Sequence, residues 1–112
     1  MPDGRVGHAE LRIGKGLVML ADEFPERQNV GPKTLGGTPV TIQVYVSDMD
    51  EVMKRAELAG GRVVRPATNE FYGDRTGIIE DPFGHVWMIK THIEDVSAVM
   101  MKRRMAEMMK PG

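Results

Sequence analysis

Few side chains of this sequence have the types and spacing that could do chemistry. His8 and Glu10 are separated by one residue, so they lie on the same side of an extended strand. A His–Glu pair with this spacing can contribute to a divalent-metal site. The structural alternative is a hydrogen-bonded polar strand face that also carries Arg12, and it is favoured because the sequence shows no third ligand.

The other candidate nucleophiles and bases have structural explanations. The chain has no cysteine, and Ser47 and Ser97 stand where helices are predicted to start. His85 follows a turn glycine at a strand end, and His92 lies beyond the last predicted strand, near two acidic residues. Neither a G-x-G-x-x-G nor a P-loop spacing occurs. These features indicate neither covalent catalysis nor nucleotide binding.

The first part of the chain is predicted to be a β-hairpin. Residues 6–13 alternate between polar and apolar side chains, which is typical of a half-buried strand, and residues 17–22 form a second, more apolar strand. Together they give a hairpin over residues 6–23. Residues 24–38 contain two prolines and three glycines, and this composition predicts a linker between two structural halves.

A strand and a helix are predicted after the linker. Residues 40–46 alternate between an apolar and a polar face. Asp48 then stands at a helix N-cap position, with Glu51 three residues later and apolar residues at helical spacing. Gly60 and Gly61 end this helix.

Three strands complete a β-α-β-β-β order over residues 39–92. A short strand is predicted before Pro66. Segments 71–79 and 85–91 are rich in β-forming residues and flank the turn sequence Asp-Pro-Phe-Gly at 81–84. This turn predicts that the last two strands are antiparallel neighbours.

The C-terminal residues 95–110 predict an amphipathic helix. Asp95 or Ser97 is the expected cap, and five of the ten methionines of the chain lie in this segment. Packing of the helix on its own domain is the favoured interpretation, and docking on a partner protein is the alternative.

The chain resembles the PhnB-like branch of the glyoxalase/bleomycin-resistance/dioxygenase group, the vicinal oxygen chelate superfamily. The clearest segments are FYGDRTG at 71–77 and DPFGHVW at 81–87, which are similar to the last hairpin of that branch. Segments 7–14, 18–23 and 44–50 also stand where the family has similar runs. The order of these segments makes the resemblance specific.

The resemblance implies an α+β fold built from βαβββ modules, with a mostly antiparallel curved sheet and a C-terminal helix. Residues 39–92 correspond to a complete module. Family members normally have a strand, a helix and another strand ahead of the Pro2-Asp3-Gly4 turn, so the first module is expected to be incomplete. A second copy is expected to cover its exposed apolar side, giving a homodimer with or without exchanged elements. The alternative is a shortened version whose first half is marginally stable.

The resemblance also implies where a site would be. In metal-dependent relatives, His and Glu side chains on the first and last strands of each module hold a divalent ion. The matching positions fall at or near Thr41 and Met88 in the complete module and at Met19 in the incomplete one. Thioethers are poor ligands for hard cations. The expectation is therefore a site without a metal cofactor, and a divalent metal held by His8 and Glu10 is the alternative.

In this fold the curved sheet encloses a cavity that suits a small organic ligand. Trp87 is expected either to stack on a planar ligand or to serve as an aromatic core residue. Arg75 is expected either to orient a carboxylate or phosphonate or to pair with its neighbour Asp74. The candidate cavity residues are Thr41, Gln43, Tyr45, Met19, Met88, Tyr72, Arg75 and Trp87.

Bulk properties exclude several partner classes. The 112 residues, 41% hydrophobic and 28% charged, predict one globular domain over 1–112. The formal net charge of −1 does not indicate nucleic-acid binding. No apolar run approaches the roughly 20 residues of a bilayer helix, so no membrane partner is expected. The absence of cysteine fits a reducing compartment, and the cytoplasm is the expected location.

Three functions remain open. The favoured one is a metal-free small-molecule-binding protein of this superfamily. The second is a divalent-metal-dependent lyase, isomerase or dioxygenase of the same superfamily. The third is an interaction module that uses its Met-rich C-terminal helix.

Overall fold

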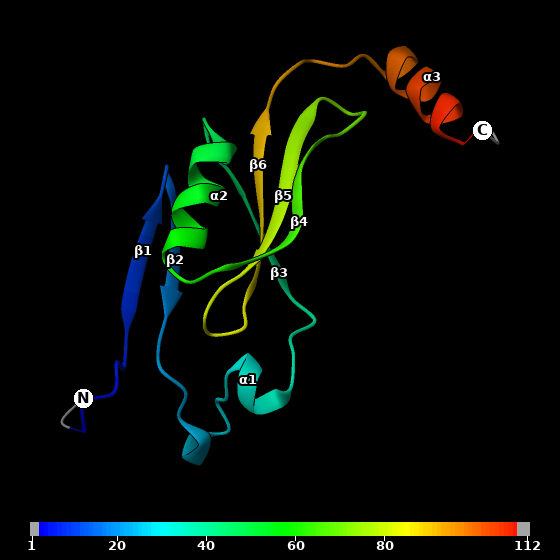
Figure 1. The fold of residues 1–112 in the computed structure, drawn as a ribbon. Helices are drawn as coiled ribbons and strands as arrows, with labels where there is room; N and C mark the ends of the chain where they lie inside the picture. Colours follow the sequence, from blue (N-terminus) through cyan, green and yellow to red (C-terminus); the bar gives the residue numbers. More distant parts are fainter. Residues whose placement is uncertain (1–2, 110–112) are drawn as a thin grey trace.

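The computed structural model describes residues 3–109. The chain is elongated: its Cα radius of gyration is 17.7 Å, against about 13 Å for a compact domain of this length. Figure 1 shows a central sheet with one helix against it, and peripheral elements at both ends. Pro2 of the predicted first turn and Lys110 of the predicted last helix lie outside the described residues.

The first element is the expected hairpin. Strands β1 (Ala9–Ile13) and β2 (Gly16–Leu20) pair antiparallel and form a two-stranded sheet. Gly14 has a φ of +58° in the connecting turn, a conformation that glycine adopts without strain. The first strand starts later than the alternating pattern predicted, because residues 6–8 are not part of the β1–β2 ladder.

The second sheet has four strands in the order β3-β6-β5-β4. Strand β3 (Thr41–Tyr45) pairs parallel with β6 (Val86–His92), while β5 (Asp74–Glu80) pairs antiparallel with both β6 and β4 (Arg62–Asn69). The β5–β6 connection is the predicted Asp-Pro-Phe-Gly turn, in which Asp81 Oδ1 accepts hydrogen bonds from the backbone of residues 83 and 85. The α+β class with a mixed, mostly antiparallel sheet and a C-terminal helix is confirmed.

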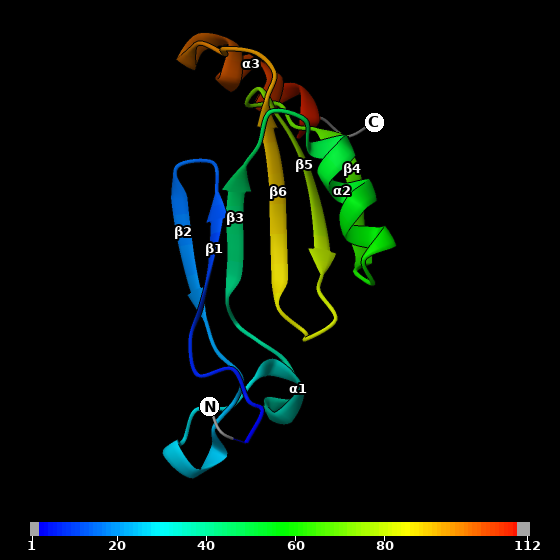
Figure 2. The same ribbon diagram turned by 90° about the vertical axis from the view of Figure 1, so that its left-hand side faces the viewer.

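Helix α2 (Met49–Leu58) covers one face of this sheet (Figure 2). It begins as predicted, because the Asp48 side chain accepts a hydrogen bond from the backbone N–H of Glu51. Its buried residues, Met49 and Met53, pack against Ile79 and Ile89 of the sheet and form the core with them. Gly77 makes this close approach possible: a Cβ there would lie 2.7 Å from the terminal methyl of Met53.

In the four-stranded sheet, two strand boundaries differ from the prediction by three residues or more. Strand β4 was expected to stop before Pro66 but continues to Asn69. It is an edge strand with register shifts on both sides of Arg65, so the missing N–H of proline is tolerated. Strand β5 starts at Asp74 instead of Phe71, because residues 71–73 form the turn from β4 and Gly73 has a φ of +97°.

The predicted linker contains two short helices. These are η1 (Pro25–Arg27) and α1 (Pro32–Leu35). The Glu23 carboxylate stabilises this segment, because its Oε2 accepts hydrogen bonds from the backbone N–H of Gly31 and from the Thr34 hydroxyl.

The C-terminal helix is α3 (Ala98–Met108), and its N-cap is Ser97, whose side chain accepts from the backbone N–H of Met100. The expected packing on its own domain is limited to a contact at the β4–β5 turn, where Arg104 donates to the Phe71 carbonyl. None of its residues is buried, and the apolar side chains Val99 and Met108 are 68% and 66% exposed. Among residues 3–109, no helix is long and apolar enough to cross a membrane.

Candidate functional site

The register of the four-stranded sheet separates its two faces. Gly77, Ile79 and Ile89 face α2. Side chains alternate along a strand, so their neighbours in sequence point to the opposite side, which no helix of the described residues 3–109 covers. We call this side the open face. It is formed by Thr41, Gln43 and Tyr45 of β3, by Asp74, Thr76 and Ile78 of β5, and by Met88, Lys90 and His92 of β6.

One end of the open face carries a chain of hydrogen bonds centred on Asp74, which is 4% exposed. The Tyr45 hydroxyl donates to Asp74 Oδ2 over 2.6 Å. His92 Nδ1 lies 3.0 Å from Asp74 Oδ1, and His92 Nε2 lies 2.7 Å from Asp95 Oδ1. Both oxygens of Asp74 are therefore occupied.

The protonation states of the residues in this hydrogen-bond network stabilise one another. Burial raises the pKa of Asp74, but the hydrogen bonds from Tyr45 and His92 outweigh burial and leave that pKa below its ordinary value. The same carboxylate raises the pKa of Tyr45 by accepting its hydroxyl proton. Hydrogen bonds to Asp74 and then to Asp95 raise the pKa of His92. This arrangement favours an ionised Asp74, a neutral Tyr45 and a protonated His92.

A second carboxylate, Glu70, lies next to this hydrogen-bond network and also accepts hydrogen bonds. Its Oε1 accepts hydrogen bonds from the Thr76 hydroxyl at 2.8 Å and from Arg65 Nη2 at 2.7 Å. Thr76 is 1% exposed, and on the neighbouring strand it stands opposite Lys90.

Lys90 is 9% exposed. Its Nζ lies 5.6 Å from the ring centroids of both Tyr45 and Tyr72, a cation–π distance for each. Within the described part of the chain, this ammonium has neither a hydrogen-bond acceptor nor an ion-pair partner.

The structure brings together half of the predicted cavity residues on the open face. Thr41, Gln43, Tyr45 and Met88 lie there on neighbouring strands. Tyr72 lies in the β4–β5 turn and reaches the same region through Lys90.

The other predicted cavity residues lie elsewhere. Arg75 is on the α2 side, where Nε and Nη2 contact the Asp50 carboxylate at 2.9 and 3.1 Å; Asp74 is not its partner. Trp87 is also on the α2 side, against the core, and its Nε1 donates to Asp81 Oδ2. Met19 lies in the separate two-stranded sheet and is 63% exposed.

Sequence reasoning missed Lys90, Asp74 and His92 as members of a site. A signal was present, because Lys90 and His92 continue the alternation that starts at Met88. The parallel pairing of β3 with β6, which sets Tyr45 beside Lys90, is a long-range feature that no local pattern announces.

The side chains present do not form a set of metal ligands. His8 Nε2 and Glu10 Oε1 lie 3.1 Å apart on β1, and both side chains are exposed. Among residues 3–109, no group of three or more His, Cys, Asp or Glu side chains is arranged to hold an ion. The ligand positions on the open face offer a hydroxyl at Thr41 and a thioether at Met88, and Lys90 follows Met88 two residues later on the same face. This donor set does not fit a divalent cation.

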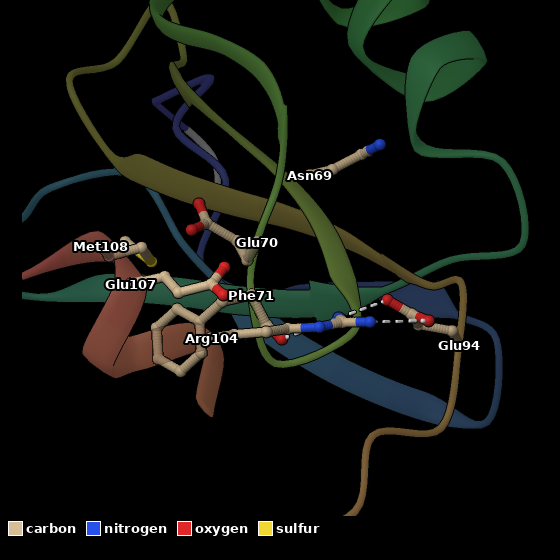
Figure 3. Close-up of a pocket in the computed structure, with 7 residues that line it drawn as sticks. All are labelled: Asn69, Glu70, Phe71, Glu94, Arg104, Glu107 and Met108. Atoms are coloured by element: carbon tan, nitrogen blue, oxygen red, sulfur yellow. Dashed lines mark hydrogen bonds and ion pairs between the residues drawn. The ribbon is translucent and has the colours of Figure 1, made fainter. Parts of the chain in front are cut away.

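Two hollows lie away from the open face. One, of about 490 Å³, lies between the β4–β5 turn and α3. Figure 3 shows its single cation, Arg104, directed at Glu94. Arg104 also donates to the carbonyl of Phe71, so its guanidinium is already engaged. The other hollow, of about 740 Å³, is largely apolar and lies on the α2 side beside Trp87.

A family model described as "Glyoxalase/Bleomycin resistance protein/Dioxygenase superfamily" matches residues 1–89. Among curated proteins, the uncharacterized protein Rv0887c of Mycobacterium tuberculosis is 42% identical over 99 residues, which are 86% of this chain and 58% of that protein. The uncharacterized protein Mb0911c of Mycobacterium bovis has the same identity and is covered over 65% of its length. The chain thus spans about three fifths of the curated relatives it matches.

Solved structures show the same fold. Protein PA1353 from Pseudomonas aeruginosa gives a TM-score of 0.60 at 24% identity, over 80% of this chain and 65% of that one. TioX from Micromonospora sp. ML1 gives 0.56 at 28% identity, over 80% and 70%. A glyoxalase/bleomycin resistance protein/dioxygenase from Nocardioides gives 0.57 at 21% identity, over 88% and 67%.

Proposed function

The chain belongs to the Glyoxalase/Bleomycin resistance protein/Dioxygenase superfamily, and on that premise we propose that it binds a small organic molecule on the open face without a resident metal ion. Within the superfamily, we place it in the PhnB-like branch. That finer placement rests on the segments 71–77 and 81–87.

One observation carries the proposal: charged and polar side chains are buried on a sheet face that no helix covers. Asp74, Thr76 and Lys90 are each at most 9% exposed, whereas Gln43 and Tyr45 beside them are exposed. Lys and Asp are rarely buried unless they are paired. Stability alone does not require such a cluster, and departures from ordinary core packing concentrate at functional sites.

The side-chain chemistry of the open face favours binding over metal-assisted catalysis. A few hydrogen-bonding groups stand beside apolar Met88 and Ile78, which is the usual composition of a small-molecule site. Neither Thr41 nor Met88 can replace the carboxylate and imidazole ligands of a Lewis-acid centre.

The test combines metal analysis with a ligand screen. Protein purified without chelator is assayed for divalent metals, and its thermal unfolding is followed with a set of small organic molecules, with and without EDTA. We expect far less than one ion per chain and a ligand-dependent rise in Tm that EDTA leaves unchanged. A ligand at one hundred times its Kd stabilises by about 2.7 kcal/mol. One tight ion per chain, with stabilisation that EDTA abolishes, would contradict the proposal.

That contrary result would support the second candidate, a divalent-metal-dependent lyase, isomerase or dioxygenase. The observation in its favour is the exposed pair of His8 and Glu10 on β1, which groups from another subunit would have to complete. Replacing both residues by alanine would then remove the bound metal.

We also propose that the protein is a homodimer in which a second copy covers the β1–β2 hairpin, with or without exchange of elements. Leu11, Leu17, Met19 and Leu20 of this hairpin are all exposed. An isolated two-stranded hairpin is at best marginally stable in water, so the hairpin needs a partner surface. Sedimentation equilibrium is expected to give a dimer mass; a well-folded monomer at all concentrations would refute it. If a different protein were found to bind α3, this would support the third candidate function, an interaction module that uses the Met-rich helix.

A further inference from the structure

Lys90 is only 9% exposed, and among residues 3–109 its ammonium has no hydrogen-bond acceptor. The charge of Lys90 helps to lower the pKa of Asp74, but the Asp74 carboxylate takes its hydrogen bonds from Tyr45 and His92. The Glu70 carboxylate accepts from Thr76 and Arg65. Among the described residues, no buried side-chain nitrogen or oxygen lacks a hydrogen-bond partner, so the unpaired Lys90 ammonium still reaches solvent. An acceptor from outside the chain can therefore approach it.

The surroundings of this ammonium are aromatic and held in place. Tyr45 is fixed through its hydroxyl, which bonds to Asp74. Tyr72 is fixed by an edge contact with Phe71, whose ring centroid lies 5.3 Å away. Two positioned rings thus flank Lys90 Nζ at equal distances of 5.6 Å. Such rings favour a planar group next to the cation.

The next step along the strand offers an apolar floor. Met88 precedes Lys90 by two residues on the same face, a separation of about 6.7 Å in an extended strand. Ile78 stands opposite Met88 on one neighbouring strand, and the Gln43 amide stands opposite on the other. The distance between Lys90 and Met88 therefore suits a small aromatic carboxylate, with its anionic group at Lys90 and its ring over Met88.

We propose that Lys90 binds the carboxylate of a planar aromatic ligand whose ring lies over Met88 and Ile78. The inference rests on the proposed small-molecule-binding function and specifies its ligand class. An ammonium offers three donors and no acceptor, so it selects an anion over a metal ion or an organic cation. Lys90 lies two residues along β6 from Met88, the position at which the resemblance places a metal ligand in metal-dependent relatives.

The test compares matched probes on the full-length protein. Benzoate and 2-naphthoate are titrated beside their neutral amides, benzamide and 2-naphthamide, and binding is followed by NMR of 13C-labelled methionine methyl groups. We expect the carboxylates to bind at least tenfold more tightly than the amides. The Met88 methyl signal should shift on binding, and the signal of Met19, in the other sheet, should not.

Two variants complete the test. Lys90→Met is expected to weaken carboxylate binding at least tenfold and to leave amide binding unchanged. Lys54→Met removes the same charge from an exposed position on α2 and is expected to change neither. If Lys90→Met does not fold, Lys90→Gln replaces it, and the comparison of carboxylate with amide on the unmodified protein needs no variant.

The outcomes separate this inference from the function on which it rests. Equal affinity for amides and carboxylates, or carboxylate binding that survives loss of Lys90, would overturn the ligand class while small-molecule binding on the open face stands. A shift at Met19 instead of Met88 would overturn the location. If none of the probes and no molecule of the wider screen binds, both proposals fail.

Discussion

The unit formed by residues 41–92 buries a core of apolar side chains, whereas the hairpin and the C-terminal helix that flank it leave most of theirs exposed. In the unit, Met49, Met53 and Ile89 are buried between α2 and the sheet. In the hairpin β1–β2 and in α3, side chains of the same kinds, such as Met19 and Met108, are mostly exposed. The unit therefore supplies its own core, whereas the hairpin and α3 are amphipathic elements without one.

Polar groups show the same difference. In the unit, a buried Asp74 is held by two hydrogen bonds from Tyr45 and His92. In the N-terminal flank, Asp3 contacts Arg5 in a solvent-exposed ion pair. Buried polar networks fix a geometry, while exposed pairs contribute little to stability. A binding site is therefore expected in the unit and a contact surface in the flanks.

The largest expected effect comes from a matched pair of methionine substitutions. Met49 is 1% exposed, so Met49→Ala should lower the free energy of unfolding by about 2–5 kcal/mol. Met19→Ala, in the hairpin, should lower it by less than about 0.5 kcal/mol at protein concentrations where the chain is monomeric. Urea unfolding measures both. Equal losses would remove the distinction between the unit and the flank.

A second pair compares aspartates. Asp74→Ala leaves the Tyr45 hydroxyl and His92 without their shared acceptor and should cost about 1–3 kcal/mol of unfolding free energy. Asp3→Ala breaks only an exposed ion pair and should have a smaller effect on the free energy of unfolding than Asp74→Ala. Chemical denaturation would show whether Asp74 has the larger effect; a reversed order would contradict the buried cluster.

The pH dependence of stability should follow His92. Its folded-state pKa is raised above the ordinary value of 6.5 by Asp74 and Asp95. A raised pKa means that the folded state binds the proton more tightly, so the stabilisation is complete below 6.5 and is lost as the pH rises through the folded-state value. The stability difference between the natural protein and His92→Gln should therefore shrink on going from pH 6 to pH 9. An NMR titration of His92 with a midpoint below 6.5 would show that the sign is wrong.

The smallest effect is expected for the contact that holds α3. Arg104 joins the helix to Glu94 and to the Phe71 carbonyl at the surface. Arg104→Ala should leave the global free energy of unfolding nearly unchanged while speeding proteolytic cleavage within α3. Loss of the cooperative unfolding transition would instead show that α3 belongs to the unit.

The local parts of this fold were readable from the sequence. The turn at residues 81–84, the Asp48 cap and the helix of residues 98–108 each depend on side chains close together in the chain. Pro66 misled the prediction because a strand accepts proline at a sheet edge, and edge position is set by tertiary structure. The alternation of residues 40–46 indicated which strand face carries Tyr45, but it could not show which residues of other strands surround Tyr45.

The site was only partly predictable for the same reason. Thr41, Gln43 and Tyr45 were correctly placed on one strand face, but the burial of Lys90 depends on two tyrosines from distant segments. Arg75 was expected to have Asp74 as its alternative partner, yet adjacent residues in a strand point to opposite faces. Its partner is Asp50, which lies 25 positions away in α2.

Hydrogen exchange measured at two protein concentrations tests directly whether residues 41–92 fold without a partner while the flanks depend on association. We expect amides of β5 and β6 to be protected to the same extent at low and high concentration. Amides of β1 and β2 should exchange fast in dilute protein and become protected as the concentration rises. Strong, concentration-independent protection of the hairpin, equal to that of β5 and β6, would contradict the account.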